Sequence, residues 1–486
     1  MKYELLFFPF VLLAVLIYYF VPKKYRWIVL IVTSIAFYAV LVQWWVFLLI
    51  GMIIVVFLLG ILIEYSRNNN KEALTNFVLV IGIILATLPL LFFKYYEPFL
   101  SQLNKWFGTN IPIASFTLLI GLSFYTFNMI GYIVDIRKGE ITAQKNIFHF
   151  MTYVCYFPHI MQGPIPSYKE TFANIIDGHV FEKQNIVQGT YRILYGLFLK
   201  LAIANLLSLV VNPVFSNYSD YSGTLIFVST LFYSVELYCD FSGFISIMLG
   251  VSLLFGIKLN ENFDKPFLAT TIAGFWRRWH ISLTKWLTKY IYIPLGGSKV
   301  GVVRWILNVF IVFIVSGIWH GVGVGFIIWG CIHAFYQVVG KFTMPVREKL
   351  LSSINLKETD VIVIIIRRVI CFILVSLAWV PFIKPDIVDI GNIYARIFSN
   401  INFSFVVDGT ISSFGGGYLM LLVVLLACIS SIMFDKLYNK NDIALIHGVN
   451  VNVICCFVLM IFAIVFSYMY FISLDVADSQ FIYFSF

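Results

Sequence analysis

The sequence is poor in charge, because only 12% of its 486 residues are Asp, Glu, Lys or Arg. Soluble globular domains carry about 25% charged residues, so an ordinary soluble protein is excluded. The net charge of +9 is modest for this length. The basic residues cluster between apolar runs, which is typical of the positive loops of membrane proteins. A nucleic-acid-binding function is therefore not expected.

Several chemical motifs are also missing. The seven cysteines show no CxxC spacing, and an odd number gives no complete disulfide framework. No histidine pair has the HxxxH or HExxH spacing of zinc sites, so neither a metal nor a bound cofactor is expected. The sequence also lacks GxSxG, a P-loop and a GxGxxG after a strand, which argues against serine hydrolases and nucleotide-binding proteins.

What the sequence does contain is a series of apolar runs, in a chain that is 61% hydrophobic. A bilayer core requires about 20 apolar residues per helix, so the runs predict an all-α, polytopic membrane protein of roughly 11–12 transmembrane helices. The first run lacks a basic start and a cleavage site, and is expected to be a first helix rather than a signal peptide. The expected spans are 4–21, 26–42, 44–63, 77–93, 118–140, 187–211, 224–256, 304–318, 322–340, 361–383, 416–433 and 451–473.

Two further segments do not fit straight spans. Residues 154–170 contain Pro158, Pro164 and Pro166, which predict a re-entrant or kinked segment shielded by protein or water. Residues 384–415 are expected to form a long external loop. Basic residues follow alternate spans, so the positive-inside rule places both termini outside a cell membrane. We expect one integral membrane domain, with N-terminal helices in 1–110, a core in 111–344 and C-terminal helices in 345–486.

The stretch 271–329 concentrates charge, tryptophan and histidine in this apolar chain. At about 100° per residue its first part has one apolar and one cationic face. It therefore predicts an amphipathic helix at the membrane surface, with tryptophans at headgroup depth and His280 on the border of the two faces. The apolar face consists of Phe275, Trp279, Leu283, Trp286, Leu287 and Tyr290, and the cations opposite are Arg277, Arg278, Lys285 and Lys289.

His320 is the strongest candidate for chemistry. It follows an apolar run between Trp319 and Gly321, and ionisable groups inside a bilayer are costly and usually functional. A neutral imidazole there can take a proton from an alcohol that attacks an acyl carbonyl, and return it to the leaving thiolate. The alternative is a core histidine bonded to a carbonyl. The glycines of WHGVGVG, which permit close backbone approach, favour the functional interpretation.

The other polar residues leave two interpretations open. His280 is either a second active-site residue or an interfacial histidine. Glu236 and Asp240 lie four positions apart, on one helical face. They are either functional carboxylates or members of a buried polar network that joins helices, and we favour the network. His333, about 220° from His320 on a shared helix, is expected to be structural. The remaining histidines lie at predicted edges or loops and are expected to be mostly solvated: His149, His159, His179 and His447.

These residues resemble the membrane-bound O-acyltransferase (MBOAT) family, in particular its bacterial alginate O-acetyltransferase-like branch. The similarity runs from about residue 118 to the end of the chain. It rests on GLSFYTFNMIGYIVDIRKG (121–139), YFPHIMQGPI (156–165), YGLFLKLAIAN (195–205), YCDFSGF (238–244), ENFDKPFLATTIAGFWRRWHISLTKWLTKYIYIPLGG (261–297) and SGIWHGVGVGFIIWGCIHA (316–334).

The resemblance implies that His320 is the active-site histidine and His280 the second motif histidine, both near a central tunnel. It implies an acetyl-CoA or other acyl-thioester donor on the cytosolic side, where the cations could attract its phosphates. An extracellular polysaccharide, or a secreted or membrane-anchored acyltransferase, is the implied acceptor. The candidate donor-side residues are Arg277, Arg278, Trp279, Lys285 and Lys289, and the candidate supporting residues are Trp319, Asp240 and Glu236.

Three alternatives remain at this point. The related D-alanyl transferases of teichoic acids share the RWH and WHG histidines and take their acyl group from a carrier protein. A secondary transporter predicts paired charges on broken helices and often an internal repeat, and the sequence has no repeat. A scaffold without catalytic activity would recruit a secreted partner. Replacement of His320 by alanine separates an enzyme from the other two classes.

Overall fold

The computed structural model describes residues 2–113, 119–161, 163–414, 417–440, 458 and 460–469. Over these residues the secondary structure is helical and contains no strand, which confirms the all-α class. The helices are α1 (Lys2–Phe20), α2 (Arg26–Val42), α3 (Val46–Asn68), α4 (Glu72–Phe107), α5 (Leu122–Lys138), α6 (Ile147–Cys155), α7 (Phe157–Ile160), α8 (Tyr168–Ile176), α9 (Lys183–Phe198), α10 (Asn205–Ser216), α11 (Gly223–Leu254), α12 (Ile272–Trp276), α13 (Ile281–Leu287), α14 (Val302–His320), α15 (Val324–Phe342), α16 (Met344–Ser353), α17 (Val361–Ala378), α18 (Val380–Ile383), α19 (Ile387–Ser399), α20 (Thr410–Ser413) and α21 (Gly417–Lys440).

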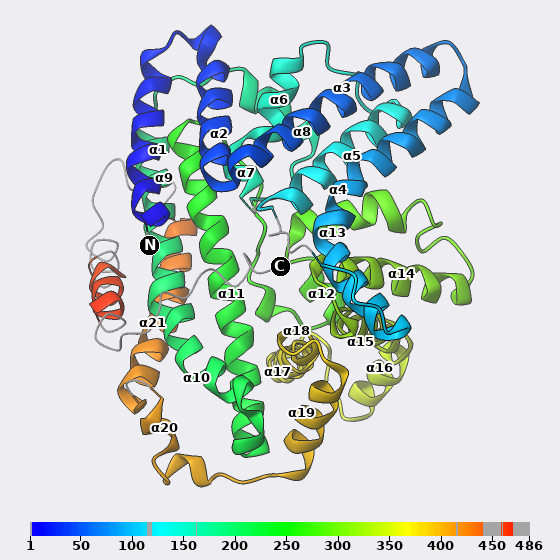
Figure 1. The fold of residues 1–486 in the computed structure, drawn as a ribbon. Coiled ribbons are helices and arrows are strands. Elements are labelled where there is room, and N and C mark those ends of the chain that lie inside the picture. The colour runs from blue at the N-terminus through cyan, green and yellow to red at the C-terminus, as the bar shows by residue number, and fades with distance from the viewer. Residues whose placement is uncertain are drawn as a thin grey trace. The chain divides into compact units, whose positions relative to one another are not determined.

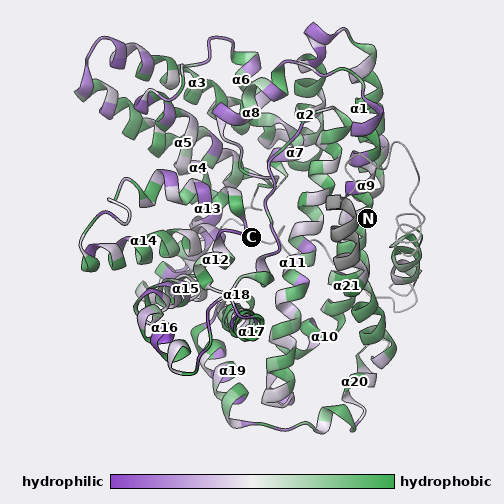
Figure 2. Cartoon of the chain, turned by 180° about the vertical axis from the view of Figure 1, so that it is seen from behind, coloured by the Kyte–Doolittle hydropathy of each residue, from purple (hydrophilic) through white to green (hydrophobic). Residues whose placement is uncertain are grey.

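Seven helical segments in the described residues are long and apolar enough to cross a membrane. Figure 2 shows hydrophobic residues along the long helices, as expected of a multi-pass membrane protein. Shorter apolar helices lie at Leu6–Phe20, Gly417–Ser431 and Met460–Met469. A total of 11–12 crossings remains a prediction, since the expected span 451–473 falls largely outside the described residues. The seven segments are Lys23–Asn68, Glu72–Phe107, Lys183–Ser216, Gly223–Leu254, Val302–His320, Val324–Phe342 and Val361–Ile383.

The chain forms two compact units that interleave along the sequence. The first comprises Met1–Thr190, Met248–Glu261 and Lys285–Ile291, and the second comprises Tyr191–Ile247, Asn262–Thr284 and Tyr292–Phe486. Both candidate histidines, His280 and His320, therefore belong to the second unit. The expected division of the sequence at residues 110 and 344 remains a prediction.

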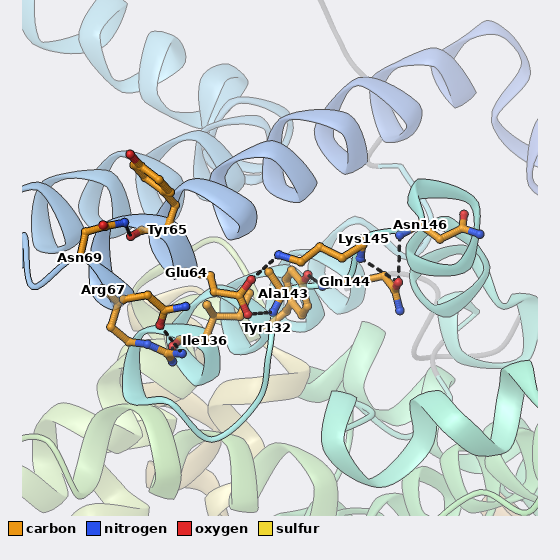
Figure 3. A network of polar contacts seen from close by, with 11 residues as sticks. Glu64, Tyr65, Arg67, Asn69, Tyr132, Ile136, Ala143, Gln144, Lys145 and Asn146 are labelled. Carbon is orange, nitrogen blue, oxygen red and sulfur yellow. Dashed lines mark hydrogen bonds and ion pairs between the residues drawn. The ribbon is translucent and has the colours of Figure 1, made fainter.

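In the first unit, α3, α4 and α5 pack against one another and α6 packs on α2 and α3. The contact of α3 with α5 is close, because a Cβ at Gly60 would lie 2.9 Å from the Tyr132 ring. Figure 3 shows the polar network at the end of this contact. Glu64 accepts a hydrogen bond from the Ala143 amide and pairs with Lys145, while the Tyr132 hydroxyl accepts from the Gln144 amide. The loop after α5 is thereby fixed to α3.

The proline-containing segment 154–170 is broken into short helices, as its sequence predicts. Chain direction changes between α6, α7 and α8, since proline removes an amide donor and clashes with the preceding turn. Its described residues from 154 to 166 are buried. Two bonds within the first unit hold it: the Phe157 amide donates to Ser34 Oγ at 3.1 Å, and Tyr156 bonds Ser252 at 2.8 Å. Protein therefore shields the irregular backbone, as a membrane setting requires.

In the second unit α14 and α15 lie side by side, and α15 also packs on α12, α17 and α18 (Figure 1). The α14–α15 crossing is close because glycines face carbonyls: a Cβ at Gly317 would lie 2.2 Å from the Phe326 oxygen, and one at Gly330 would lie 2.4 Å from the Phe313 oxygen. The expectation of a loop over 384–415 is wrong in part. This segment contains α19, capped by the Asp386 side chain, as well as α20.

Candidate active site

The segment that carries His280 is two short helices rather than one. Thr271 caps α12 by accepting a hydrogen bond from the Gly274 amide at 3.0 Å, and α12 ends at Trp276. The backbone then turns, and His280 has φ of +45°, in the left-handed region. A non-glycine residue adopts this region at an energetic cost. The predicted continuous amphipathic helix is therefore wrong, because apolar periodicity carries no information about one strained residue.

The expected apolar face of this segment includes two aromatic residues that are buried in protein, and its depth in the membrane remains a prediction. Phe275 and Trp279 are buried inside the second unit, with 1% and 2% of their surfaces exposed. The Trp279 ring centroid lies 5.1 Å from that of Phe263 and 5.5 Å from that of Trp379. These rings therefore pack against protein side chains. Arg277, on the opposite face, is exposed as predicted.

His320 is the last residue of α14, and 4% of its surface is exposed. The C-terminal end of a helix favours positive charge, which suits an imidazole that accepts a proton. Aromatic rings surround it, with centroids at 4.8 Å for Trp319, 5.1 Å for Trp329 and 5.4 Å for Phe382. The chain passes next to this cluster at Gly321, where a Cβ would lie 2.1 Å from the Phe326 ring. A side chain at Gly321 would therefore clash with the Phe326 ring, as the glycine-rich motif WHGVGVG predicts.

The fold brings His280 and His320 together, although 40 positions separate them in the sequence. Their ring centroids are 6.5 Å apart, so both imidazoles can reach one substrate group. His280 is fully buried and contacts Phe241 and Trp319, with ring centroids at 5.0 and 6.0 Å. Burial lowers the pKa of His280 to about 3, because the charged form loses its hydration. This imidazole is therefore neutral at physiological pH.

A third polar residue in this centre escaped the sequence analysis. Asn262, which is fully buried, has its amide nitrogen 3.3 Å from His280 Nδ1 and its amide oxygen 2.9 Å from the Ser282 nitrogen. It lies in the ENFDKPF segment that carries part of the family resemblance. No spacing rule links Asn262 to His280, so only the fold identifies the contact.

The predicted donor-side cations differ in their pairing. In the second unit, Arg278 pairs with Asp264 at 3.2 Å on the surface. In the first unit, Lys289 Nζ lies 2.7 Å from carboxylate oxygens of both Asp135 and Glu140. The hydrogen bond from Lys289 lowers the pKa of Glu140. Lys285, by contrast, is exposed.

The intramembrane carboxylates form part of a buried charge cluster in the second unit. Lys200 Nζ lies 2.6 Å from Asp240 Oδ1, with 6% and 0% of these side chains exposed. Glu236, one turn earlier on α11, is also buried. The residue after Asp240 is Phe241, whose ring packs on His280. Asp240 is therefore adjacent in the chain to a residue that lines the histidine centre.

The remaining histidines divide into buried and partly exposed ones. His333 is fully buried on α15, where its Nδ1 accepts a hydrogen bond from Trp276 Nε1 at 3.2 Å. His159 is also buried, with 2% exposed, so the expectation of solvation is wrong for it. That expectation overlooked the packing of segment 154–170. His149 and His179 are partly exposed, and His447 lies outside the described residues. Among described residues, no three His, Cys, Asp or Glu side chains could hold a metal ion.

Comparison with known proteins identifies the family of this chain. The model of the membrane-bound O-acyltransferase family matches residues 137–380, a range that contains Asn262, His280 and His320. The chain belongs to the membrane-bound O-acyltransferase family. It is an acyltransferase with the helical membrane fold of that family, as the sequence resemblance predicts.

Three relatives illustrate the range of similar enzymes. A probable alginate O-acetylase of Pseudomonas syringae pv. tomato is 31% identical over 392 residues, covering 79% of this chain and 72% of the relative. A peptidoglycan O-acetyltransferase of Helicobacter pylori is 31% identical, covering 73% and 70%. A teichoic acid D-alanyltransferase of Bacillus subtilis is 27% identical, covering 64% and 80%. This membrane-bound O-acyltransferase is thus similar to enzymes that modify cell-surface polymers.

Proposed function

We propose that this enzyme passes an acetyl or other short acyl group from a cytosolic thioester, acetyl-CoA, to an extracellular polysaccharide. The acceptor is reached directly or through a secreted or membrane-anchored partner acyltransferase. The observation that carries the proposal is the pair of buried imidazoles, His280 and His320, with ring centroids 6.5 Å apart. The similarity to O-acetylases of alginate and peptidoglycan supports the acetyl group and the polymeric acceptor.

In the proposed reaction His320 serves as the base. The acceptor hydroxyl gives its proton to the neutral His320 imidazole while its oxygen bonds to the acyl carbon. The carbon–sulfur bond then breaks, and the thiolate leaves with the proton from His320. His280 is the second active-site histidine, next to the same acyl group. The aromatic walls around both rings exclude water, which would otherwise hydrolyse the thioester.

The remaining site residues have supporting roles in this proposal. Trp319 packs beside the two imidazoles, since it contacts both rings. The buried pair of Lys200 and Asp240 holds α11, on which Phe241 contacts His280; Glu236 belongs to the same cluster. Trp279 fixes the backbone before His280 by its burial.

The donor side of the proposal rests on the cations of the sequence. Arg277 and Arg278, and separately Lys285 and Lys289, attract the phosphates of the donor from the cytosol. When these cations lie on the cytosolic side, the positive-inside rule places both termini outside the cell membrane. A reagent that cannot cross the membrane and labels tags at both termini of intact cells supports this orientation. Labelling only after permeabilisation contradicts it.

The reaction is tested with purified enzyme in sealed vesicles that contain acetyl-CoA. Polymer and a candidate partner acyltransferase are supplied outside. Acetyl transfer to the outer polymer that disappears with His320→Ala, in a protein that still folds, supports the proposal. Consumption of a D-alanyl carrier protein in place of acetyl-CoA favours the alternative for which the Bacillus subtilis relative is named. No acyl transfer from any thioester overturns the enzymatic assignment of this site and leaves a transporter or scaffold.

A further inference from the structure

Asn262 makes three contacts, one with His280 and one with each of the two residues that follow it. Its backbone oxygen accepts a hydrogen bond from the Ile281 amide at 2.9 Å. Its side-chain oxygen accepts from the Ser282 amide at 2.9 Å, and its side-chain nitrogen lies 3.3 Å from His280 Nδ1. The two amides belong to the first turn of α13, where helix amides have no partner within the helix. One distant residue thus caps α13 and contacts the imidazole that precedes it.

These contacts determine which way the Asn262 amide points. A backbone N–H can only donate, so the atom that faces the Ser282 amide must be the oxygen of Asn262. The amide nitrogen of Asn262 then faces His280, and it can only donate as well. His280 Nδ1 is therefore the acceptor and carries no proton. In a neutral imidazole the proton must then be on Nε2.

The backbone of His280 is held in the same arrangement. Its φ of +45° is costly for a residue with a side chain, and it persists because the neighbouring amides of Ile281 and Ser282 are both bound to Asn262. The ring is enclosed by Phe241 and Trp319. A flip of the imidazole would exchange Nδ1 for the Cδ2–H group, which cannot accept from the amide nitrogen of Asn262, and this hydrogen bond would be lost.

We infer that Asn262 is a positioning residue that holds His280 in the Nε2–H tautomer, so that His280 acts as a hydrogen-bond donor to the acyl carbonyl. This inference rests on the proposed function. The donor stabilises the negative charge that develops on the carbonyl oxygen when the acceptor oxygen attacks. His280 cannot take the acceptor proton on Nε2, which already carries one. The proton therefore goes to His320, and the two imidazoles have different roles.

The tautomer is measured directly by ¹⁵N NMR on histidine-labelled enzyme, with His280 assigned by the signals lost in His280→Gln. The expected result is a protonated Nε2 and an unprotonated Nδ1. In Asn262→Asp, one carboxylate oxygen still accepts from the Ser282 amide and the other accepts a proton placed on Nδ1. The neutral ring then has its lone pair on Nε2 at alkaline pH. A wild-type ring protonated at Nδ1, or an unchanged pattern in Asn262→Asp, overturns the inference.

The kinetic consequence is a loss of kcat. At alkaline pH, Asn262→Asp is expected to reduce kcat about 10²- to 10³-fold, as for the loss of one oxyanion donor, with KM for the thioester little changed. Asn260→Asp is the matched control, since it makes the same chemical change two residues earlier, at an exposed side chain that donates to the exposed Glu170. Equal activity of Asn262→Asp and the control contradicts the inference.

A second pair of variants keeps the test valid if Asn262→Asp does not fold. His280→Gln retains an N–H donor near the position of Nε2 but cannot act as a base, whereas His280→Phe retains neither. We expect the glutamine variant to keep at least about tenfold more activity than the phenylalanine variant, a difference expected of one hydrogen bond. Equal loss in both variants overturns the donor role. The NMR result does not require turnover, so failure of the proposed acyl transfer and failure of the tautomer assignment are distinguishable.

Discussion

Two buried polar centres lie close together in the second unit, and they differ in how their charge is balanced. Lys200 and Asp240 form an ion pair at 2.6 Å in which opposite charges compensate each other. His280 and His320 are two groups of the same type at a ring distance of 6.5 Å, and neither can neutralise a charge on the other. In the ion pair each charged group has an opposite charge beside it, and the pair stabilises the fold. The histidine pair leaves imidazoles available for proton transfer and for a substrate.

The largest expected effect is on the activity of the His280–His320 pair. His320→Ala removes the base and is expected to reduce acyl transfer about 10²- to 10⁴-fold. Thermal unfolding in detergent should change much less than activity, because the buried Lys200–Asp240 pair is left in place. Radiolabelled acetyl transfer per folded molecule measures the effect. If His320→Ala instead unfolds the protein while the folded fraction keeps its activity, the histidine is structural and the comparison fails.

The ion pair should show the opposite pattern. Lys200→Met leaves Asp240 buried without its cation and is expected to destabilise the fold by about 3–5 kcal/mol. The double variant Lys200→Met/Asp240→Leu removes both charges and should recover much of this loss. Thermal unfolding of the two variants, compared in one detergent, checks this order. A double variant that is less stable than Lys200→Met contradicts the assignment of a compensated pair.

The two lysines of the first unit allow a similar comparison at smaller scale. Lys285 is exposed, whereas Lys289 contacts Asp135 and Glu140. Lys285→Ala is expected to raise KM for the thioester about 2- to 5-fold at low salt, as for one exposed charge worth up to about 1 kcal/mol, and salt should remove the difference. Lys289→Ala should raise this KM and lower stability as well, because Lys289 also pairs with Asp135 and Glu140. An unchanged KM for Lys285→Ala at low salt argues against its role in donor attraction.

A further expected effect is the pH dependence of stability through His280. Its pKa is lowered from 6.5 in the unfolded chain to about 3 in the folded protein, by burial. Between these values the unfolded state binds a proton that the folded state does not, so the contribution of His280 is complete above pH 6.5 and is lost as pH falls. His280→Gln cannot titrate and should unfold with a shallower decline between pH 7 and 5. An equal decline in both proteins contradicts a neutral, desolvated imidazole.

Much of the membrane architecture could be predicted from sequence, because long apolar runs favour helices in a bilayer. The run 26–42 coincides with α2, and the prolines of 154–170 correctly indicate a broken segment. Helical content in 384–415 was missed, since its polar residues conceal α19. The site was predicted only in part. His320 is evident from its apolar and glycine-rich surroundings, whereas the strained backbone of His280 and its contact with Asn262 depend on a tertiary arrangement that no local pattern encodes.

The most direct test of the account is a single-turnover measurement of radiolabelled acetyl transfer from acetyl-CoA, with polymer and a partner acyltransferase present. Wild type, His320→Ala and Lys200→Met/Asp240→Leu are compared per folded molecule. The account predicts transfer by wild type and by the double variant, and none above background by His320→Ala. Transfer by His320→Ala at the wild-type rate would contradict the assignment of the imidazole pair as the acyl-transfer centre.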